Sequence, residues 1–154
     1  MTLRNDMICV YIVRPDADGQ SFEFLQMKRH AEDYLGGTWQ PVYGTAEAGE
    51  TAVEAALREM REETHLAPRE FYRLGIAVTF YTSNNDTTWI VPTFCAIISR
   101  EDEVTLNDEH EELRWITRDK AHKAFMWPSD RTALASLCED ILDNSPAKPY
   151  LKIL

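Results

Sequence analysis

The segment from Thr51 to Thr64 constrains the fold of this chain more than any other, because it specifies a helix and the two faces of that helix. Thr51 and Glu54 form a capping box, in which each side chain can bond the first free backbone amide of the other. We therefore expect a helix from about Ala52 to Thr64. Apolar residues recur in it every three or four positions, which predicts one face packed on a core. These residues are Val53, Ala56, Leu57 and Met60.

Three glutamates lie on a different face of the same helix. Glu59, Glu62 and Glu63 are spaced i, i+3 and i+4, so their carboxylates lie within about one helical turn of each other. Like charges at this spacing destabilise a helix by roughly 0.2 to 0.5 kcal/mol per pair. A divalent cation such as Mg²⁺, which takes oxygen ligands and is often shared with substrate phosphates, would reverse the sign of that cost. A solvated acidic face is the alternative explanation.

The spacing around these glutamates resembles the signature of the Nudix family, G-x5-E-x7-R-E-U-x-E-E-x-G-U, where U is a bulky aliphatic residue. The chain has Gly44, Glu50 and the run Arg58–Leu66 at the required spacing, and His65 stands where the signature has glycine. That glycine would follow the end of the helix, where a left-handed residue is common, and His tolerates this conformation better than most residues do. The difference therefore concerns local geometry more than chemistry.

A second difference lies upstream, where Pro41-Val42-Tyr43-Gly44 replaces the Pro-Gly-Gly of many members. The segments Trp39-Gln40 and Gly49–Thr51, together with Glu47, resemble the subgroup of dATP and dihydroneopterin triphosphate pyrophosphohydrolases. The resemblance implies an α/β fold, a Nudix-type α/β/α sandwich with a mixed sheet, in which residues 1–154 form one domain.

The resemblance also implies metal-binding roles for the box residues. Glu59 and Glu63 are expected to bind the principal Mg²⁺, for which Mn²⁺ is an alternative. Glu62 is expected to bind a second ion or to act as a catalytic group that helps to deprotonate water. The carbonyl oxygen of Gly44 is expected to complete a coordination shell.

Other expected roles fall outside this acidic set. We expect Glu50 and Arg58 to support the site structurally, by a charge-assisted hydrogen bond between the loop and the helix. Glu109-His110 lies four residues before Arg114-Trp115, an arrangement that resembles one found after the box in many Nudix hydrolases. The resemblance makes Glu109 a catalytic base or an additional metal ligand. We expect His110 to be an exposed loop residue.

Four residues are candidates for substrate binding, each with a structural alternative. Lys28 and Arg29 end a predicted strand, where they are either solvated or bind the phosphate or base of the substrate. Trp39 follows a glycine-rich turn, so it belongs either to the core or to the substrate cleft that the resemblance implies. Tyr81 is either a strand-pair aromatic residue or a platform that stacks on a base or pterin ring.

Composition excludes several classes of protein and partner. The net charge of -10 over 154 residues, without a basic tract, argues against binding to nucleic acid but not against a polyphosphate that arrives with its own cation. Met7–Val13, the apolar run near the N-terminus, is too short to span a membrane. No membrane partner is therefore expected, and the chain is expected to be cytoplasmic. Cys9, Cys95 and Cys138 are expected to be buried free thiols.

The remaining apolar pattern predicts an alternation of strands and helices. The tail Pro146–Leu154 carries apolar residues that can dock on the domain or on a second copy of the chain, as a homodimer. Strands are expected at Met7–Val13, Phe22–Lys28, Leu74–Tyr81, Trp89–Ser99 and Leu113–Thr117. A short helix is expected from Thr117 to Ala124 and a longer one from Ser129 or Asp130 to Leu142.

The activity that the resemblance implies is Mg²⁺-dependent hydrolysis of a diphosphate linkage. The substrate would be a nucleoside triphosphate or a similar compound, resembling dATP or dihydroneopterin triphosphate, and the products would be a monophosphate and pyrophosphate. A dinucleoside polyphosphate or a nucleoside diphosphate sugar is an alternative substrate. A Nudix-fold module that binds a nucleotide without cleaving it is an alternative of another class.

Overall fold

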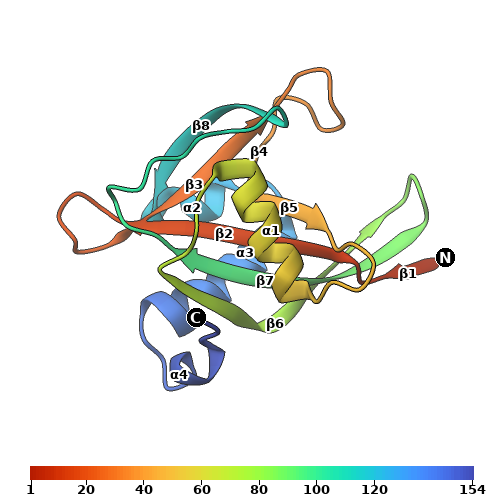
Figure 1. Cartoon of the computed structure of the whole chain (residues 1–154). Coiled ribbons are helices and arrows are strands. Elements are labelled where there is room, and N and C mark those ends of the chain that lie inside the picture. Colours follow the sequence, from red (N-terminus) through yellow and green to blue (C-terminus); the bar gives the residue numbers. More distant parts are fainter.

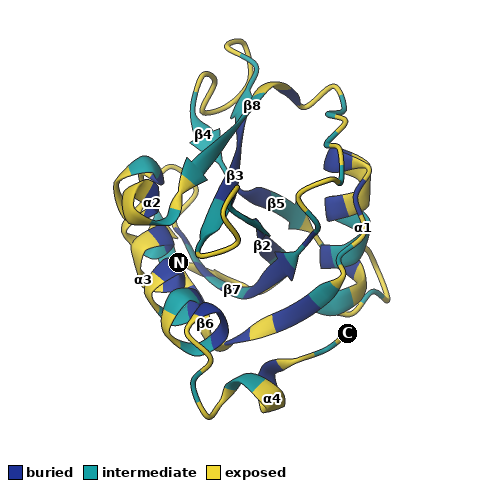
Figure 2. Ribbon diagram, turned by 90° about the vertical axis from the view of Figure 1, so that its left-hand side faces the viewer, coloured by how far each residue is buried: buried dark blue, intermediate teal, exposed yellow.

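An eight-stranded mixed sheet lies at the centre of the computed structural model, which describes residues 1–154, and helices cover both of its faces (Figure 1). Helix α1 (Ala52–Thr64) packs on one face, while α2 (Arg118–Ala124) and α3 (Pro128–Leu137) pack on the other (Figure 2). The predicted α/β/α sandwich is therefore confirmed. The strands are β1 (Thr2–Arg4), β2 (Met7–Pro15), β3 (Phe22–Arg29), β4 (Trp39–Gln40), β5 (Val42–Thr45), β6 (Glu70–Thr82), β7 (Thr87–Ile97) and β8 (His110–Thr117).

Strand β2 lies at the centre of the sheet, because it joins β3 and β7, each of which pairs with two further strands. It runs antiparallel to β3 and β5 and parallel to β7. Strand β7 pairs in turn with β1, in parallel, and with β6, antiparallel, while β3 pairs antiparallel with β4 and β8. Both orientations occur, as predicted for a mixed sheet. This order brings the end of β3, the start of β8 and the C-terminal end of α1 to one region of the protein.

Each face of the sheet has its own hydrophobic core. Alternate residues of β2 face opposite sides, so that Val10 joins the core under α1 while Tyr11 joins the core under α3. A strand covered on both faces reads as a continuous apolar run. On the side of α1, Met60 is fully buried against β2 and its neighbours, as its place in the predicted apolar stripe requires.

The predicted elements are present, with several differences in extent, and β6 begins at Glu70, four residues earlier than predicted. The two-residue β4 and the four-residue β5, together with β1, are too short to give a period-two pattern, and the sequence analysis missed them. The long C-terminal helix begins after Trp127, since Asp130 caps it from its third position, and it ends in a π-helical turn, η1 (Cys138–Leu142). Strand β8 begins at His110, three residues earlier than predicted.

The tail docks on its own chain. The backbone amide of Ile153 donates to the carbonyl of Phe71 in β6 at 2.7 Å, and Tyr72 forms an isolated bridge with Lys152. A short helix, α4 (Lys148–Leu151), precedes this contact. All three cysteines are free, with Cys9 and Cys95 buried and Cys138 partly buried. No helix combines the length and the apolar character that crossing a membrane would demand.

Candidate metal and catalytic site

Helix α1 begins and ends as the sequence predicts. The Thr51 hydroxyl accepts from the Glu54 amide at 3.2 Å, and the Glu54 carboxylate accepts from the Thr51 amide at 2.8 Å, which completes the capping box. At the other end His65 adopts the left-handed conformation, with φ 59° and ψ 19°, in the place where the signature has glycine. The ring nitrogen Nδ1 of His65 also lies 2.8 Å from the carbonyl oxygen of Thr105.

The segment before β8 is attached to the C-terminal end of α1. The Thr105 amide donates to the Thr64 carbonyl at 3.0 Å, and the Asn107 amide donates to the Glu63 carbonyl at 3.4 Å. These bonds use carbonyl groups that the last turn of a helix leaves without partners. They also bring Glu109, which lies 46 residues after Glu63 in sequence, to the end of the box helix.

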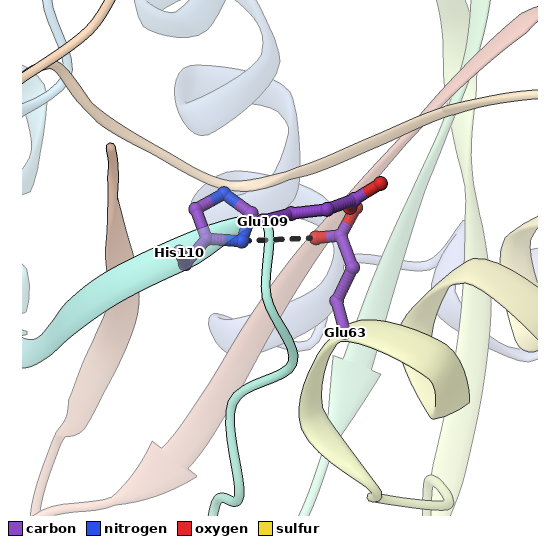
Figure 3. Close-up of side chains that lie close together, drawn as sticks. All are labelled: Glu63, Glu109 and His110. Carbon is purple, nitrogen blue, oxygen red and sulfur yellow. Dashed lines mark ion pairs between the residues drawn. The ribbon is translucent and has the colours of Figure 1, made fainter. Parts of the chain in front are cut away.

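Glu63, Glu109 and His110 form the cluster at the centre of the site (Figure 3). One potential ligand atom from each residue lies within 4.8 Å of the others, and Glu63 Oε2 lies 3.9 Å from His110 Nδ1. The side chains of Glu63 and His110 are each 3% exposed, whereas Glu109 is exposed. The cluster is therefore buried on the side of Glu63 and His110 and open to solvent on the side of Glu109.

Burial and mutual repulsion perturb the carboxylates of this site. Desolvation, followed by a shared hydrogen bond with Glu109 and by the charges of Glu109 and Glu59, raises the pKa of Glu63 from its ordinary 4.5 to about 10. Desolvation also raises the pKa of Glu59, although Arg58 opposes the shift. Groups with shifts of this kind, caused by burial and by like charges, cluster at functional sites.

Arg58 joins the box residues to one another. Its guanidinium makes two bonds to Glu50, of 2.7 and 3.0 Å, and a third to the carbonyl of Thr45 at 3.0 Å. Its Nη1 donates to Glu59 at 2.8 Å and to Glu62 at 3.3 Å. These bonds lower the pKa of Glu50 to about 2, chiefly through the Arg58 side chain. The structure thus places Glu50 and Arg58 in the contact that the sequence analysis expected, and Arg58 offsets the repulsion among the glutamates.

Gly44 gives Glu59 the space that it occupies. A Cβ atom at Gly44 would lie 2.2 Å from Glu59 Cγ and 2.3 Å from Glu59 Cδ, so no other residue fits there unless Glu59 moves. The backbone of β5 and the carboxylate of Glu59 therefore lie side by side. The expectation that the Gly44 carbonyl completes a coordination shell stays a prediction.

His110 corrects an expectation, because it is buried and not an exposed loop residue. Strand β8 pairs with β3 so that Glu112 lies opposite Lys28 but His110 lies opposite Arg29, a register shift that leaves Glu111 unpaired. Such a bulge turns the side chain that follows it to the other face of the sheet. Regular alternation from Leu113 would put His110 on the face away from α1, and the bulge turns it toward α1.

Several buried polar atoms around this cluster have no hydrogen-bond partner in the protein. Buried polar groups normally have partners, so a concentration of exceptions in one place points to a ligand or ion that would satisfy them. Carboxylate oxygen atoms with no donor fit a cation, and an arginine N–H with no acceptor fits an anion such as phosphate. These atoms are Glu63 Oε2, both ring nitrogens of His110, Arg29 Nε and Gln40 Nε2. The sequence analysis assigned no site role to His110 or Gln40, although both lie in segments that resemble the family, Glu109-His110 and Trp39-Gln40.

The candidate substrate residues lie in different places. Lys28 and Arg29 are neighbours on β3, so they face opposite sides of the sheet, and the charge of Arg29 acts on Glu63. Trp39 lies under the guanidinium of Arg114, whose Cζ is 4.1 Å from the ring centroid, with Lys28 Nζ at 5.9 Å. Tyr81 lies in the β6–β7 hairpin, where its hydroxyl donates to Asp86. The turn of that hairpin lies away from the C-terminal end of α1 (Figure 1).

Comparison with known proteins agrees with this architecture. The family model described as NUDIX domain matches residues 4–137. Over 134 residues the chain is 31% identical to "Putative 8-oxo-dGTP diphosphatase 3" of Mycobacterium tuberculosis, covering 80% of this chain and 60% of that protein. The chain thus spans less than two thirds of the length of that relative.

Two further relatives have other printed activities. The chain is 30% identical over 112 residues to the asymmetrical bis(5'-nucleosyl)-tetraphosphatase of Mus musculus, covering 70% of this chain and 72% of that protein. The solved structure of the dihydroneopterin triphosphate pyrophosphohydrolase of E. coli superimposes with a TM-score of 0.70 at 23% identity, covering 89% of this chain and 94% of that one, and it shows a shared fold. Because the family model spans most of the sequence and the fold agrees, this chain belongs to the NUDIX family.

Proposed function

We propose that this protein hydrolyses a diphosphate linkage in a nucleoside triphosphate or a similar polyphosphate, with Mg²⁺ or Mn²⁺ as its metal ion. The observation that carries the proposal is the buried carboxylate of Glu63, which has one oxygen without a partner beside Glu109 and within reach of the charge of Arg29. A hard cation satisfies such an oxygen, and a phosphate oxygen satisfies both the cation and the arginine.

The box residues divide the work among themselves in this proposal. Glu59 and Glu63 would hold the principal ion beside the carbonyl of Gly44, and Glu62 would serve a second ion or the attacking water. A bound Mg²⁺ would neutralise charge on the phosphates and lower the pKa of a bound water. Arg58 holds Glu59 in place through the 2.8 Å bond, so that the carboxylate is oriented before substrate binds.

Glu109 is the proposed proton acceptor. It is exposed, it lies at the mouth of the cluster, and it can take the proton of a water that attacks phosphorus while the bridging P–O bond breaks. A new P–O bond forms to the oxygen of the water, and the leaving group is either pyrophosphate or the monophosphate. Arg29, with its buried Nε unpartnered, is placed to bind a phosphate oxygen of the substrate.

The names of the relatives support a nucleotide polyphosphate as the class of substrate. An 8-oxo-dGTP diphosphatase, a dinucleoside tetraphosphatase and a dihydroneopterin triphosphate pyrophosphohydrolase act on different compounds that share a polyphosphate chain on a heterocyclic nucleoside or its analogue. The face that carries Trp39 and Arg114 supplies an aromatic ring and a cation next to the end of β3, where the remainder of such a substrate can lie.

A substrate panel tests the proposal. The protein is incubated with Mg²⁺ and dNTPs, dihydroneopterin triphosphate, dinucleoside tetraphosphate or a nucleoside diphosphate sugar, and products are identified by mass spectrometry after coupling to pyrophosphatase. We expect turnover of at least one compound, and a loss of nearly all turnover in Glu62→Gln and Glu63→Gln with the fold retained. Glu139→Gln, which changes an exposed glutamate on the opposite side of the sheet, is the matched control and should retain full turnover.

Two outcomes would contradict the proposal. Tight binding of a nucleotide in a melting assay, without release of any product from the panel, would favour the non-catalytic binding module. Unchanged turnover in Glu62→Gln and Glu63→Gln would remove the roles assigned to the box glutamates.

A further inference from the structure

We propose that His110 is a direct nitrogen ligand of the metal ion at this site and that it gives the site a preference for Mn²⁺ and other transition metals over Mg²⁺. This inference rests on the proposed function, because it concerns the ion that the box glutamates would hold. It adds a donor atom that none of the acidic residues supplies.

The first support is the position of the ring. His110 Nδ1 lies 3.9 Å from Glu63 Oε2, and the two side chains point toward each other from β8 and α1 (Figure 3). That separation is too long for a hydrogen bond. Two donors that share one ion at about 2.0 to 2.2 Å lie roughly 3 to 4.3 Å apart, depending on the angle between them. The observed 3.9 Å lies within that range.

The second support is the absence of any other partner for the ring. His110 is 5% exposed, and neither of its ring nitrogens has a hydrogen-bond partner in the protein. A histidine that serves only packing normally donates one ring N–H to a carbonyl, a carboxylate or a water. Even the exposed His65 has such a partner, since its Nδ1 lies 2.8 Å from the carbonyl oxygen of Thr105. His110 instead directs an unpaired nitrogen at a carboxylate oxygen that is unpaired as well.

The third support is the bulge that aims the ring. With regular alternation along β8, His110 would face α2 with Arg114, and no metal ligand lies there. The register shift opposite Lys28 and Arg29 reverses it toward α1. Bulges interrupt a hydrogen-bonded ladder and are found where a side chain has to be re-aimed beside an active site.

The donor chemistry sets the preference among ions. Mg²⁺ takes oxygen ligands almost exclusively, whereas imidazole suits transition metals, and a mixed set of two carboxylates and one imidazole suits Mn²⁺, Fe²⁺, Co²⁺ or Zn²⁺ better than Mg²⁺. Glu59 and Glu63, which would hold the ion, supply the carboxylates of that set, and Glu109 lies beside Glu63. The site would accept Mg²⁺ through its oxygen atoms and would gain a further bond from a transition metal.

Pulsed EPR of bound Mn²⁺ tests this directly, without substrate and without turnover. Wild-type protein grown with ordinary histidine and with ¹⁵N-histidine is loaded with one equivalent of Mn²⁺, and electron spin-echo envelope modulation reports a directly bound nitrogen. We expect ¹⁴N modulation that changes to the ¹⁵N pattern on labelling. His110→Gln should abolish it and weaken Mn²⁺ binding by at least about tenfold, the loss that even an outer-shell partner of a metal site causes.

His30→Gln is the matched control, since His30 Nδ1 lies 3.4 Å from the carboxylate of Glu111, the residue that follows His110. It should retain the nitrogen modulation. The labelling result requires no substitution, so it holds even where His110→Gln fails to fold.

The outcomes separate this inference from the proposed function. The role of His110 would be overturned if Mn²⁺ bound without nitrogen modulation. It would also be overturned if the modulation were lost in His30→Gln and retained in His110→Gln. In either case, hydrolysis measured in parallel would leave the proposed function standing. A wild-type protein that binds neither Mn²⁺ nor Mg²⁺ would overturn both.

Discussion

Replacement of Glu63 by glutamine should raise the free energy of unfolding of the metal-free protein relative to the wild type, by an amount that grows as the pH rises. The same replacement should remove metal binding. The cause is the buried carboxyl group, whose pKa is raised to about 10 by desolvation and by Glu109. Below pH 4.5 the group is protonated in both the folded and the unfolded protein, and it contributes no difference. Above pH 4.5 the unfolded chain releases this proton and the folded protein keeps it, so the free energy of unfolding of the wild type falls with pH until about pH 10.

The magnitude follows from the shift. Each pH unit in that window costs the folded protein about 1.4 kcal/mol relative to the unfolded chain, so between pH 5 and pH 7 the wild type should lose on the order of 3 kcal/mol through this group. Glutamine does not titrate, so its variant escapes that loss. The buried amide carries a separate cost of about 1 to 3 kcal/mol that does not depend on pH. The difference in stability between variant and wild type should therefore rise by on the order of 3 kcal/mol from pH 5 to pH 7.

Urea unfolding of EDTA-treated protein at pH 5, 6 and 7, followed by tryptophan fluorescence, measures this difference. Addition of Mg²⁺ at 100 times its dissociation constant should return about 2.7 kcal/mol to the wild type at pH 7 and nothing to Glu63→Gln. Glu139→Gln, at an exposed position, should follow the wild type throughout. A stability difference between Glu63→Gln and wild type that stays constant from pH 5 to pH 7 would refute the reasoning.

Three further variants test the support of the site. Gly44→Ala should lower turnover at least about tenfold and weaken metal binding, because its Cβ would displace Glu59, and circular dichroism should show that the fold remains. Arg58→Lys should destabilise the protein at pH 7, and its difference from the wild type should narrow as the pH falls from 4.5 through 2, which acid titration of unfolding will report. The Arg58 contact lowers the pKa of Glu50 to about 2, so this contribution to stability is present above pH 4.5 and is lost as Glu50 becomes protonated in the folded protein. His65→Gly should change the melting temperature little, since relief of about 1 to 2 kcal/mol of left-handed strain offsets the lost ring hydrogen bond. Amide hydrogen exchange should become faster around Thr105, whose carbonyl the ring contacts.

The box helix was predictable because its determinants are local. The Thr51–Glu54 capping box and the apolar spacing up to Met60 fix the start and the buried face within one turn of the residues that cause them, and the observed helix has the predicted bounds, Ala52 to Thr64. The left-handed conformation of His65 was anticipated for the same reason, since the residue that follows a helix often adopts it. The contact between Glu50 and Arg58 was expected from the resemblance of the box and is present.

The short strands and the depth of the site were not predictable in this way. Strands β4 and β5 are held by pairing with β3 and β2, which are distant in sequence, and their two to four residues carry no periodic signal. The bonds from Thr105 and Asn107 that bring Glu109 to Glu63 run between backbone atoms, and almost any sequence can make them. No residue type marks such contacts.

The sequence by itself determined the family, the box helix and the row of carboxylates along it, because caps and spacing act over a few residues. Only the tertiary structure decided which of these groups are buried together. His110 shows the difference most clearly, since its local sequence suits an exposed loop, whereas one unpaired residue in the ladder between β3 and β8 turns its ring into the protein. Desolvation depends on atoms from every part of the chain, and so does the raised pKa of Glu63 that makes this cluster a candidate for chemistry.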